Sequence, residues 1–167
     1  RVAADPRFSA ANLELSEIVR RSAGKLRVLT TNDYSGNTDI NAGTVELGDG
    51  ATADGTLGSG YLNNNSALIF NAAAFQDVAN SVAGPGTLVK KGPGVTRLSG
   101  VNYFSSGISI EAGTLRAGSP SALGDTTGGT TNTSGGTLDL GGQNLGPEPV
   151  LALGSGVGGA GAILNSG

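Results

Sequence analysis

The 167-residue sequence predicts an all-β protein, built as a single-stranded, right-handed parallel β-helix of about six to seven coils. Three observations lead to this class. Apolar and polar residues alternate over short runs, glycine, asparagine and proline interrupt the runs, and the pattern recurs at an offset of about 70 residues. A β-sandwich also has many short strands, but only a solenoid has a reason to repeat at a fixed spacing.

The composition fits a thin core. Gly, Ser, Thr and Asn together make up more than two fifths of the chain, whereas Leu, Ile, Val and Phe make up just under a quarter. That apolar share stays above the roughly 20% typical of disordered chains, and a net charge of −3 does not force the chain apart. A solenoid interior is only one small side chain deep on each strand, which explains how so few apolar residues could suffice.

The missing residue types exclude most familiar active sites. The chain has no His and no Cys, so it cannot form a Ser-His-Asp triad, a thiolate nucleophile, a zinc site of the usual kind or a disulfide. We therefore expect no enzyme and no cofactor. No apolar run reaches about 18 residues, so we also expect no membrane-spanning segment.

The internal repeat divides the chain. Residues 87–156 align without gaps on residues 17–86, with 15 identities over 70 positions, and residues 157–167 resemble the start of a third copy. Residues 1–16 have no repeat partner and are interpreted as an N-terminal cap or linker. Each copy makes three coils of about 23 residues, a plausible β-helix circumference.

The strands follow in order from this pattern. Residues 17–20 could form a helix by propensity, but their partner segment TLVKKGPG favours a strand and turn. Leu26 and Val28 flank a polar residue, and AIL (162–164) has the pattern of a final strand. The other alternating positions recur between the copies: Ile40, Ala42, Val45 and Leu47 as Ile110, Ala112, Leu115 and Ala117, and Leu68 and Phe70 as Leu138 and Leu140. Glycines are placed at the corners, because they accept positive φ without steric cost.

The segment GPGTLVKKGPGVTRLSGVNYFSSGISIEAGTLRAG (84–118) resembles the autotransporter-associated β-strand repeat. The positions on its pattern are Gly84, Gly86, Leu88, Lys90 or Lys91, Gly92, Gly94, Leu98, Gly100, Asn102, Tyr103, Ile110, Gly113, Thr114, Leu115 and Gly118. Thr96 and Ser106 depart from it, where the family prefers Leu and Gly. The resemblance implies a passenger segment of a secreted bacterial surface protein that crosses the outer membrane through a barrel. It implies no catalytic residues, since the family is defined by a repeat and not by a reaction.

Basic residues gather at two places related by the repeat, which predicts a cationic stripe along one side of the rod. Its residues are Arg20, Arg21, Lys25, Arg27, Lys90, Lys91, Arg97 and Arg116. One interpretation is a site for acidic glycans, lipid headgroups or a partner. The other is a solvated face whose charges discourage strand aggregation.

Other features are weaker indications of a site. Asp49 and Asp54 lie in one turn and leave calcium binding open, while Asn64 and Asn132 begin N-x-S sequons. Asn32 and Asn102 occupy equivalent repeat positions and are expected to hydrogen-bond their own turns. Residues 117–167 contain acidic groups but no cation, and the ends of a solenoid expose unpaired strand backbone.

These observations predict a non-catalytic structural or adhesive β-solenoid segment of an autotransporter-like passenger, located outside the cell at the bacterial surface and associated with the outer membrane. The alternative is an extracellular filament subunit that stacks end to end. A polysaccharide-cleaving β-helix is less favoured, because charged residues are few and no long insertion separates the strands. Expected partners are a second copy or neighbouring repeats at the solenoid ends and surface glycans or host ligands, but no nucleic acid.

Overall fold

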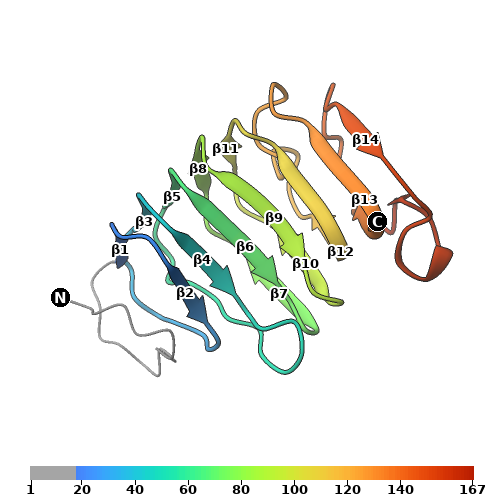
Figure 1. Ribbon diagram of the computed structural model, residues 1–167. Helices are drawn as coiled ribbons and strands as arrows, with labels where there is room; N and C mark the ends of the chain where they lie inside the picture. Colours follow the sequence, from blue (N-terminus) through green and yellow to red (C-terminus); the bar gives the residue numbers. More distant parts are fainter. Residues whose placement is uncertain (1–17) are drawn as a thin grey trace.

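The computed structural model describes residues 18–167, which wind into a rod of stacked coils (Figure 1). The first face of the rod is a sheet of β1 (Ile18–Arg20), β3 (Thr38–Ile40), β5 (Leu62–Asn64), β8 (Val82–Gly84) and β11 (Tyr103–Phe104). The second face holds β2 (Lys25–Val28), β4 (Thr44–Leu47), β6 (Ala67–Asn71), β9 (Thr87–Lys91), β12 (Ile108–Ala117), β13 (Thr130–Asp139) and β14 (Val150–Ala152). A third face holds β7 (Phe75–Val78), β10 (Val95–Leu98), the second halves of β12 and β13, and β15 (Ile163–Leu164).

Every strand pair in this part of the chain is parallel, and each strand pairs with strands one coil away. The seven strands of the second face mark seven successive coils. The predicted parallel β-helix is therefore confirmed, as are strands at 18–20 and at 163–164. A single turn of 3-10 helix, η1 (Val157–Gly159), lies near the end, and no helix within residues 18–167 has the length and apolarity needed to cross a membrane. The predicted cap or linker at 1–16 lies outside the described residues.

The coils have unequal lengths. On the first face Ile18, Thr38, Leu62 and Val82 lie side by side, so three coils run there from position 18 to position 82, which is shorter than the repeat offset. That offset instead equates Ile18 with Leu88, which lies in β9 on the second face. Equivalent positions in the two sequence copies thus do not always lie on the same side of the rod, although the copies are related in sequence.

The core is a set of columns that run along the rod axis. In the central column of the second face, in-register residues from successive coils stack on one another: Val28, Leu47, Phe70, Lys90, Ile110 and Asn132, all buried. Burying each large apolar side chain contributes about 1.5–3 kcal/mol, a gain that the four apolar members Val28, Leu47, Phe70 and Ile110 provide. On each strand, the residues directly before and after the column residue point outward, as the alternating pattern predicted.

Glycine allows the corner between the second and third faces to close. Gly113 has φ 67°, and a Cβ there would meet the backbone carbonyls of Gly92 and Gly94 in the coil below. Only a residue without a side chain fits where two coils approach this closely. The same corner receives the buried amine of Lys90, so its geometry also matters for the charged groups.

Polar residues inside the rod have partners in neighbouring coils. Thr96, one of the departures from the family pattern, is fully buried, and its hydroxyl donates to Gln76 Oε1 at 3.3 Å. Gln76 Nε2 in turn donates to the carbonyl of Gly55 at 2.6 Å. The departure at Thr96 therefore belongs to an internal hydrogen-bonded pair, which avoids the cost of an unsatisfied buried group.

Buried asparagines also tie the coils together. Asn32 donates to the carbonyl of Thr30 in its own turn and to that of Thr56 in the next coil. Asn102 donates to Ala122 O at 2.8 Å and accepts from Val82 N, so it bonds the coils on either side. The expectation of bonds within the turn is right for Asn32 and wrong for Asn102, because the Asn102 amide faces the neighbouring coils.

Candidate functional site

The cationic stripe is divided between the faces and the interior. Lys90 is fully buried between Phe70 and Ile110, so the prediction that it shares an exposed side with the other cations is wrong. Its side chain points inward because it alternates in phase with Leu88, two residues earlier on β9. Arg20 lies on the first face, whereas Arg97 lies on the third. Whether the exposed members bind an anion stays a prediction.

The ammonium group of Lys90 hydrogen-bonds backbone carbonyls inside the rod. Its Nζ donates to the backbone carbonyls of Lys91 at 2.5 Å, Gly92 at 2.9 Å and Ala112 at 3.1 Å. These three bonds use all the donors of an ammonium group and link two successive coils at the corner. Burial lowers the pKa of Lys90 to about 8, against a partly opposing effect of the Asp54 carboxylate.

The cations of β2 converge on one carboxylate. Glu46, whose side chain is 4% exposed, lies 2.5 Å from Lys25 Nζ and 3.4 Å from Arg27 Nη2, and it accepts from Asn71 Nδ2 at 2.6 Å. Burial alone would raise the pKa of Glu46, but the hydrogen bonds from Lys25 and Asn71 and the positive charges of Lys25 and Arg27 together hold it below its usual value. The single negative charge of Glu46 is thus shared by two of the stripe residues, and the cluster keeps one net positive charge.

The remaining paired cations also bridge coils. Lys91 lies 3.3 Å from Glu111, and on the third face Arg116 lies 3.6 Å from Asp139. Arg97 is 4.0 Å from Asp77, and the register places Arg97 directly beside Arg116. Pairs at this exposure contribute about 0–1 kcal/mol each, so they align coils more than they stabilise the fold. An anion would have to compete with these carboxylates.

The first two basic residues of the stripe lie near the start of the described rod. Arg20 donates to Ser22 Oγ at 2.5 Å and to the carbonyl of Ala23 at 3.0 Å, while Arg21 is exposed. The Nε of Arg20 is buried without a hydrogen-bond partner.

The two aspartates considered for calcium accept hydrogen bonds from backbone N–H groups. Asp49 accepts from the N–H groups of residues 51, 52 and 53, and these bonds hold its pKa well below the usual value. Asp54 accepts from the N–H groups of Ala73 and Ala74 in the next coil. Among residues 18–167 no cluster of three or more His, Cys, Asp or Glu side chains could hold a metal ion.

The asparagines of both sequons are fully buried. Asn64 Nδ2 donates to Thr87 O at 3.0 Å, and Asn132 Nδ2 donates to Ala162 O at 2.6 Å. A folded chain therefore offers neither amide to a modifying enzyme, because both nitrogens are enclosed by the next coil.

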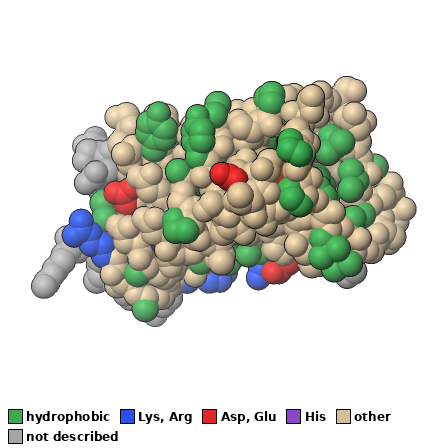
Figure 2. All heavy atoms as spheres, turned by 90° about the horizontal axis from the view of Figure 1, so that it is seen from above, with side chains coloured by type: hydrophobic (Ala, Val, Ile, Leu, Met, Phe, Trp, Pro, Cys, Tyr) green, Lys and Arg blue, Asp and Glu red, His purple; other side chains and the backbone are tan. Residues whose placement is uncertain are grey.

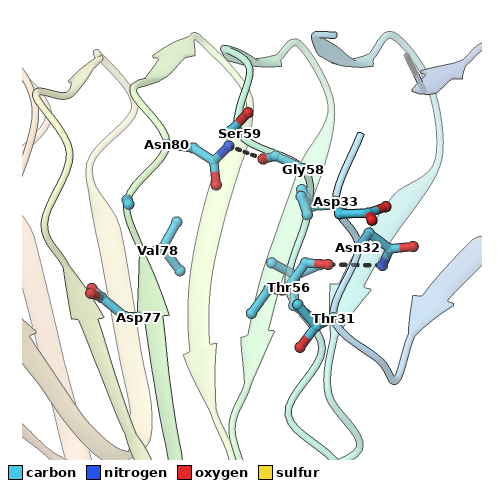
Figure 3. Close-up of a pocket in the computed structure, with 12 residues that line it drawn as sticks. Thr31, Asn32, Asp33, Thr56, Gly58, Ser59, Asp77, Val78 and Asn80 are labelled. Atoms are coloured by element: carbon cyan, nitrogen blue, oxygen red, sulfur yellow. Dashed lines mark hydrogen bonds between the residues drawn. The ribbon is translucent and has the colours of Figure 1, made fainter. Parts of the chain in front are cut away.

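A pocket of about 320 Å³ opens where three coils turn from the third face toward the first (Figure 3). Leu47, Leu57 and Val78 are its buried apolar residues. Its other lining residues are polar or small: Thr31, Asn32, Asp33, Thr56, Gly58, Ser59, Asp77, Ala79 and Asn80. No sequence motif indicates this site, because its residues come from three coils and lie far apart in the sequence.

The last coil is unusually apolar at its surface. Leu151 is 55% exposed and Leu153 is 49% exposed, and Val157, Ile163 and Leu164 are exposed nearby. Figure 2 shows hydrophobic side chains gathered toward the end of the rod that lies away from the grey residues, with few charged groups among them. Burial raises the pKa of Glu148, and the charge of Asp125 adds to this effect. In this C-terminal stretch, residues 150–164, β14 and β15 each pair with β13 on one side only.

The geometry defines a repeat protein, in which charged and amide side chains link the stacked coils. The profile of the passenger-associated-transport-repeat family matches residues 21–47 and 88–117. These two stretches run from β2 to β4 and from β9 to β12. The chain thus carries autotransporter passenger β-repeats, as the resemblance in its sequence indicated.

A comparison with curated proteins finds a relative named "Adhesin BmaC autotransporter" in Brucella suis biovar 1 (strain 1330). It is 34% identical over 142 residues, which cover 82% of this chain and 4% of the adhesin. The chain therefore spans only a small part of that protein's length. No solved structure matches the chain significantly.

Proposed function

We propose that this chain is a non-catalytic structural and adhesive β-solenoid segment of a passenger protein displayed at the bacterial surface. The observation that carries the proposal is the combination of passenger repeats with coils that are closed by hydrogen bonds and ion pairs. The 34% identity to part of an autotransporter adhesin supports the same role. Each coil presents outward side chains at a fixed spacing of about 4.8 Å, which suits a rigid surface for contact with other molecules.

Display on living cells tests this function. The chain would be placed between a signal peptide and an autotransporter barrel in a bacterium without other adhesins, and cells displaying the barrel alone would serve as the control. We expect the chain to become accessible to antibody on intact cells and to increase attachment to epithelial monolayers. Retention inside the cell, or attachment equal to the control, would refute the proposal. Release of reducing sugar from pectin or alginate would refute its non-catalytic part.

A second candidate function is end-to-end assembly into an extracellular filament. It is supported by Leu151 and Leu153 on and beside β14, which are 55% and 49% exposed, since exposed apolar side chains favour association. It is also supported by the charges, because residues 117–167 contain no cation whereas residues 18–28 contain four cations and no acidic residue.

Sedimentation velocity at increasing concentration tests the filament. We expect the wild type to form species larger than a monomer and Leu151→Lys to remove them. A matched control is Val101→Lys, which changes a residue of similar exposure (48%) elsewhere on the rod. A wild type that stays monomeric at millimolar concentration would refute end-to-end assembly.

A further inference from the structure

We propose that the pocket at the corner between the third and first faces binds a single uncharged sugar ring. The inference rests on the proposed adhesive function, because it names the chemical class of ligand that the surface would contact. At about 320 Å³ the pocket lies at the lower end of the range of small-molecule sites, roughly 300–1,000 Å³, so it suits one ring and not a longer chain.

The walls of the pocket are preformed. Asn32 Nδ2 donates to Thr56 O at 2.9 Å, and Asn80 Nδ2 donates to the carbonyls of Gly58 at 2.6 Å and Gly60 at 2.7 Å. Figure 3 shows the Asn32–Thr56 and Asn80–Gly58 bonds joining neighbouring coils around the pocket. These amides are committed to holding backbone, so a ligand would meet a rigid frame and binding would carry little ordering cost.

The lining chemistry favours a ligand that donates hydrogen bonds and has an apolar side. Leu47, Leu57 and Val78 form the apolar base of the pocket, and Leu57 is the most exposed of them at 7%. The hydroxyl of Ser59 and the carboxylate of Asp33 belong to exposed residues at the rim, and a carboxylate accepts hydrogen bonds only. A pyranose offers hydroxyl donors around its edge and C–H groups on its faces, which matches both kinds of surface.

Charge argues against other ligand classes. No Lys or Arg lines the pocket, and Asp33 and Asp77 repel an anion. A cation is less favoured than a neutral ligand, because Asp77 already accepts from Ser99 Oγ at 2.7 Å and lies 4.0 Å from Arg97. The two carboxylates lie on opposite sides of the pocket in Figure 3 and do not converge on one point. An uncharged polar ring remains the best fit.

The experiment is an NMR titration of the ¹⁵N-labelled chain with the methyl glycosides of glucose, galactose, mannose and N-acetylglucosamine, with n-butylammonium as the cationic comparator. We expect at least one glycoside to produce saturable shifts confined to residues 31–33, 56–59 and 77–80. Asp33→Ala should weaken that binding about tenfold by removing a charged acceptor, and Ser59→Ile should abolish it by filling the rim. Asp125→Ala, an exposed carboxylate outside the pocket lining, is the matched control and should leave binding unchanged.

The proposal is overturned if none of the four glycosides gives localised, saturable shifts, if only n-butylammonium does, or if both pocket variants bind like the wild type. Spectra of the free variants provide the control for folding and should match that of the wild type outside the substituted positions. The titration is independent of cell attachment. If displayed pocket variants still attach while the sugars fail to bind, the pocket proposal falls and the adhesive function stands.

Discussion

The buried ammonium of Lys90 predicts that the stability of this protein rises with pH in the mildly alkaline range. A lysine in water has a pKa of 10.5, whereas burial lowers that of Lys90 to about 8. Between these two values the unfolded chain binds a proton that the folded chain has released. The free energy of unfolding therefore increases with pH, since stability rises wherever the unfolded state holds more protons.

The magnitude follows from the two pKa values. At pH 7.5 the lowered pKa of Lys90 reduces the free energy of unfolding by about 3 kcal/mol, which is almost its full effect. At pH 9.5 this reduction is only about 1.4 kcal/mol. Lys90 should thus add about 2 kcal/mol of stability between these pH values. Burial raises the pKa of Tyr34, so its folded phenol stays neutral while the unfolded one ionises near pH 10, and stability falls there. Measurements are best kept at or below pH 9.5.

The assay is urea unfolding followed by circular dichroism at half-unit steps from pH 7.5 to 9.5. Lys90→Met removes the titrating group but keeps a long side chain, so its free energy of unfolding should lack this rise. Lys91→Met, which removes an exposed cation paired with Glu111, is the matched control and should keep the rise. Parallel curves for the wild type and Lys90→Met would refute the reasoning. If that variant fails to fold, the ¹³Cε shift of Lys90 in the wild type should titrate near pH 8, and a midpoint near 10.5 would refute it equally.

Three further predictions concern stability and are measured by the same unfolding assay. Because the pKa of Glu46 is lowered in the fold, its contribution is present above its usual value of 4.5 and lost as pH falls through the folded value. Glu46→Gln should therefore cost about 1–3 kcal/mol at pH 7 and flatten the decline toward pH 3, and an unchanged decline would contradict this. Gly113→Ala should lower the free energy of unfolding by about 2–4 kcal/mol, because the new Cβ would collide with two backbone carbonyls. Gly146 has the same φ of 67° but open space around it, so Gly146→Ala should lower it by only about 1 kcal/mol. Equal losses for the two variants would rule out the collision. Phe70→Ala should lower the free energy of unfolding by about 3–5 kcal/mol, because Phe70 is fully buried. Phe75 is 55% exposed, so Phe75→Ala should lower it by less than about 1 kcal/mol. Similar losses for the two variants would show that Phe70 does not lie in the core.

Ion pairs between coils suggest why the cationic residues recur in the sequence. Arg27 and Arg97 are equivalent in the repeat, and each lies beside a carboxylate of an adjacent coil, Glu46 and Asp77 respectively. Such pairs are worth little individually at the surface. They do favour the observed register, since a slipped coil would move each cation away from its carboxylate. These pairs therefore give Arg27 and Arg97 a role between coils that needs no anionic ligand.

The sequence by itself determined the class of fold and most of the interior. The alternating pattern predicted that Val45, Leu47, Leu68 and Phe70 point inward, and all four are buried. The prediction holds because successive side chains of a strand point to opposite faces. The repeat identified a solenoid, because only stacked coils bury such a pattern in every copy.

Only the tertiary structure decided which coil positions meet. All three faces carry the same period-2 pattern, so local sequence does not say on which face a strand lies, and the face depends on the summed lengths of all preceding turns. Because the three coils from Ile18 to Val82 together are shorter than the repeat offset, the second copy begins one face further around the rod. That advance separated Arg20 from Lys90, and the corner carbonyls then allowed a charged lysine to be buried. The pocket arose likewise from residues of three coils, which no contiguous motif could reveal.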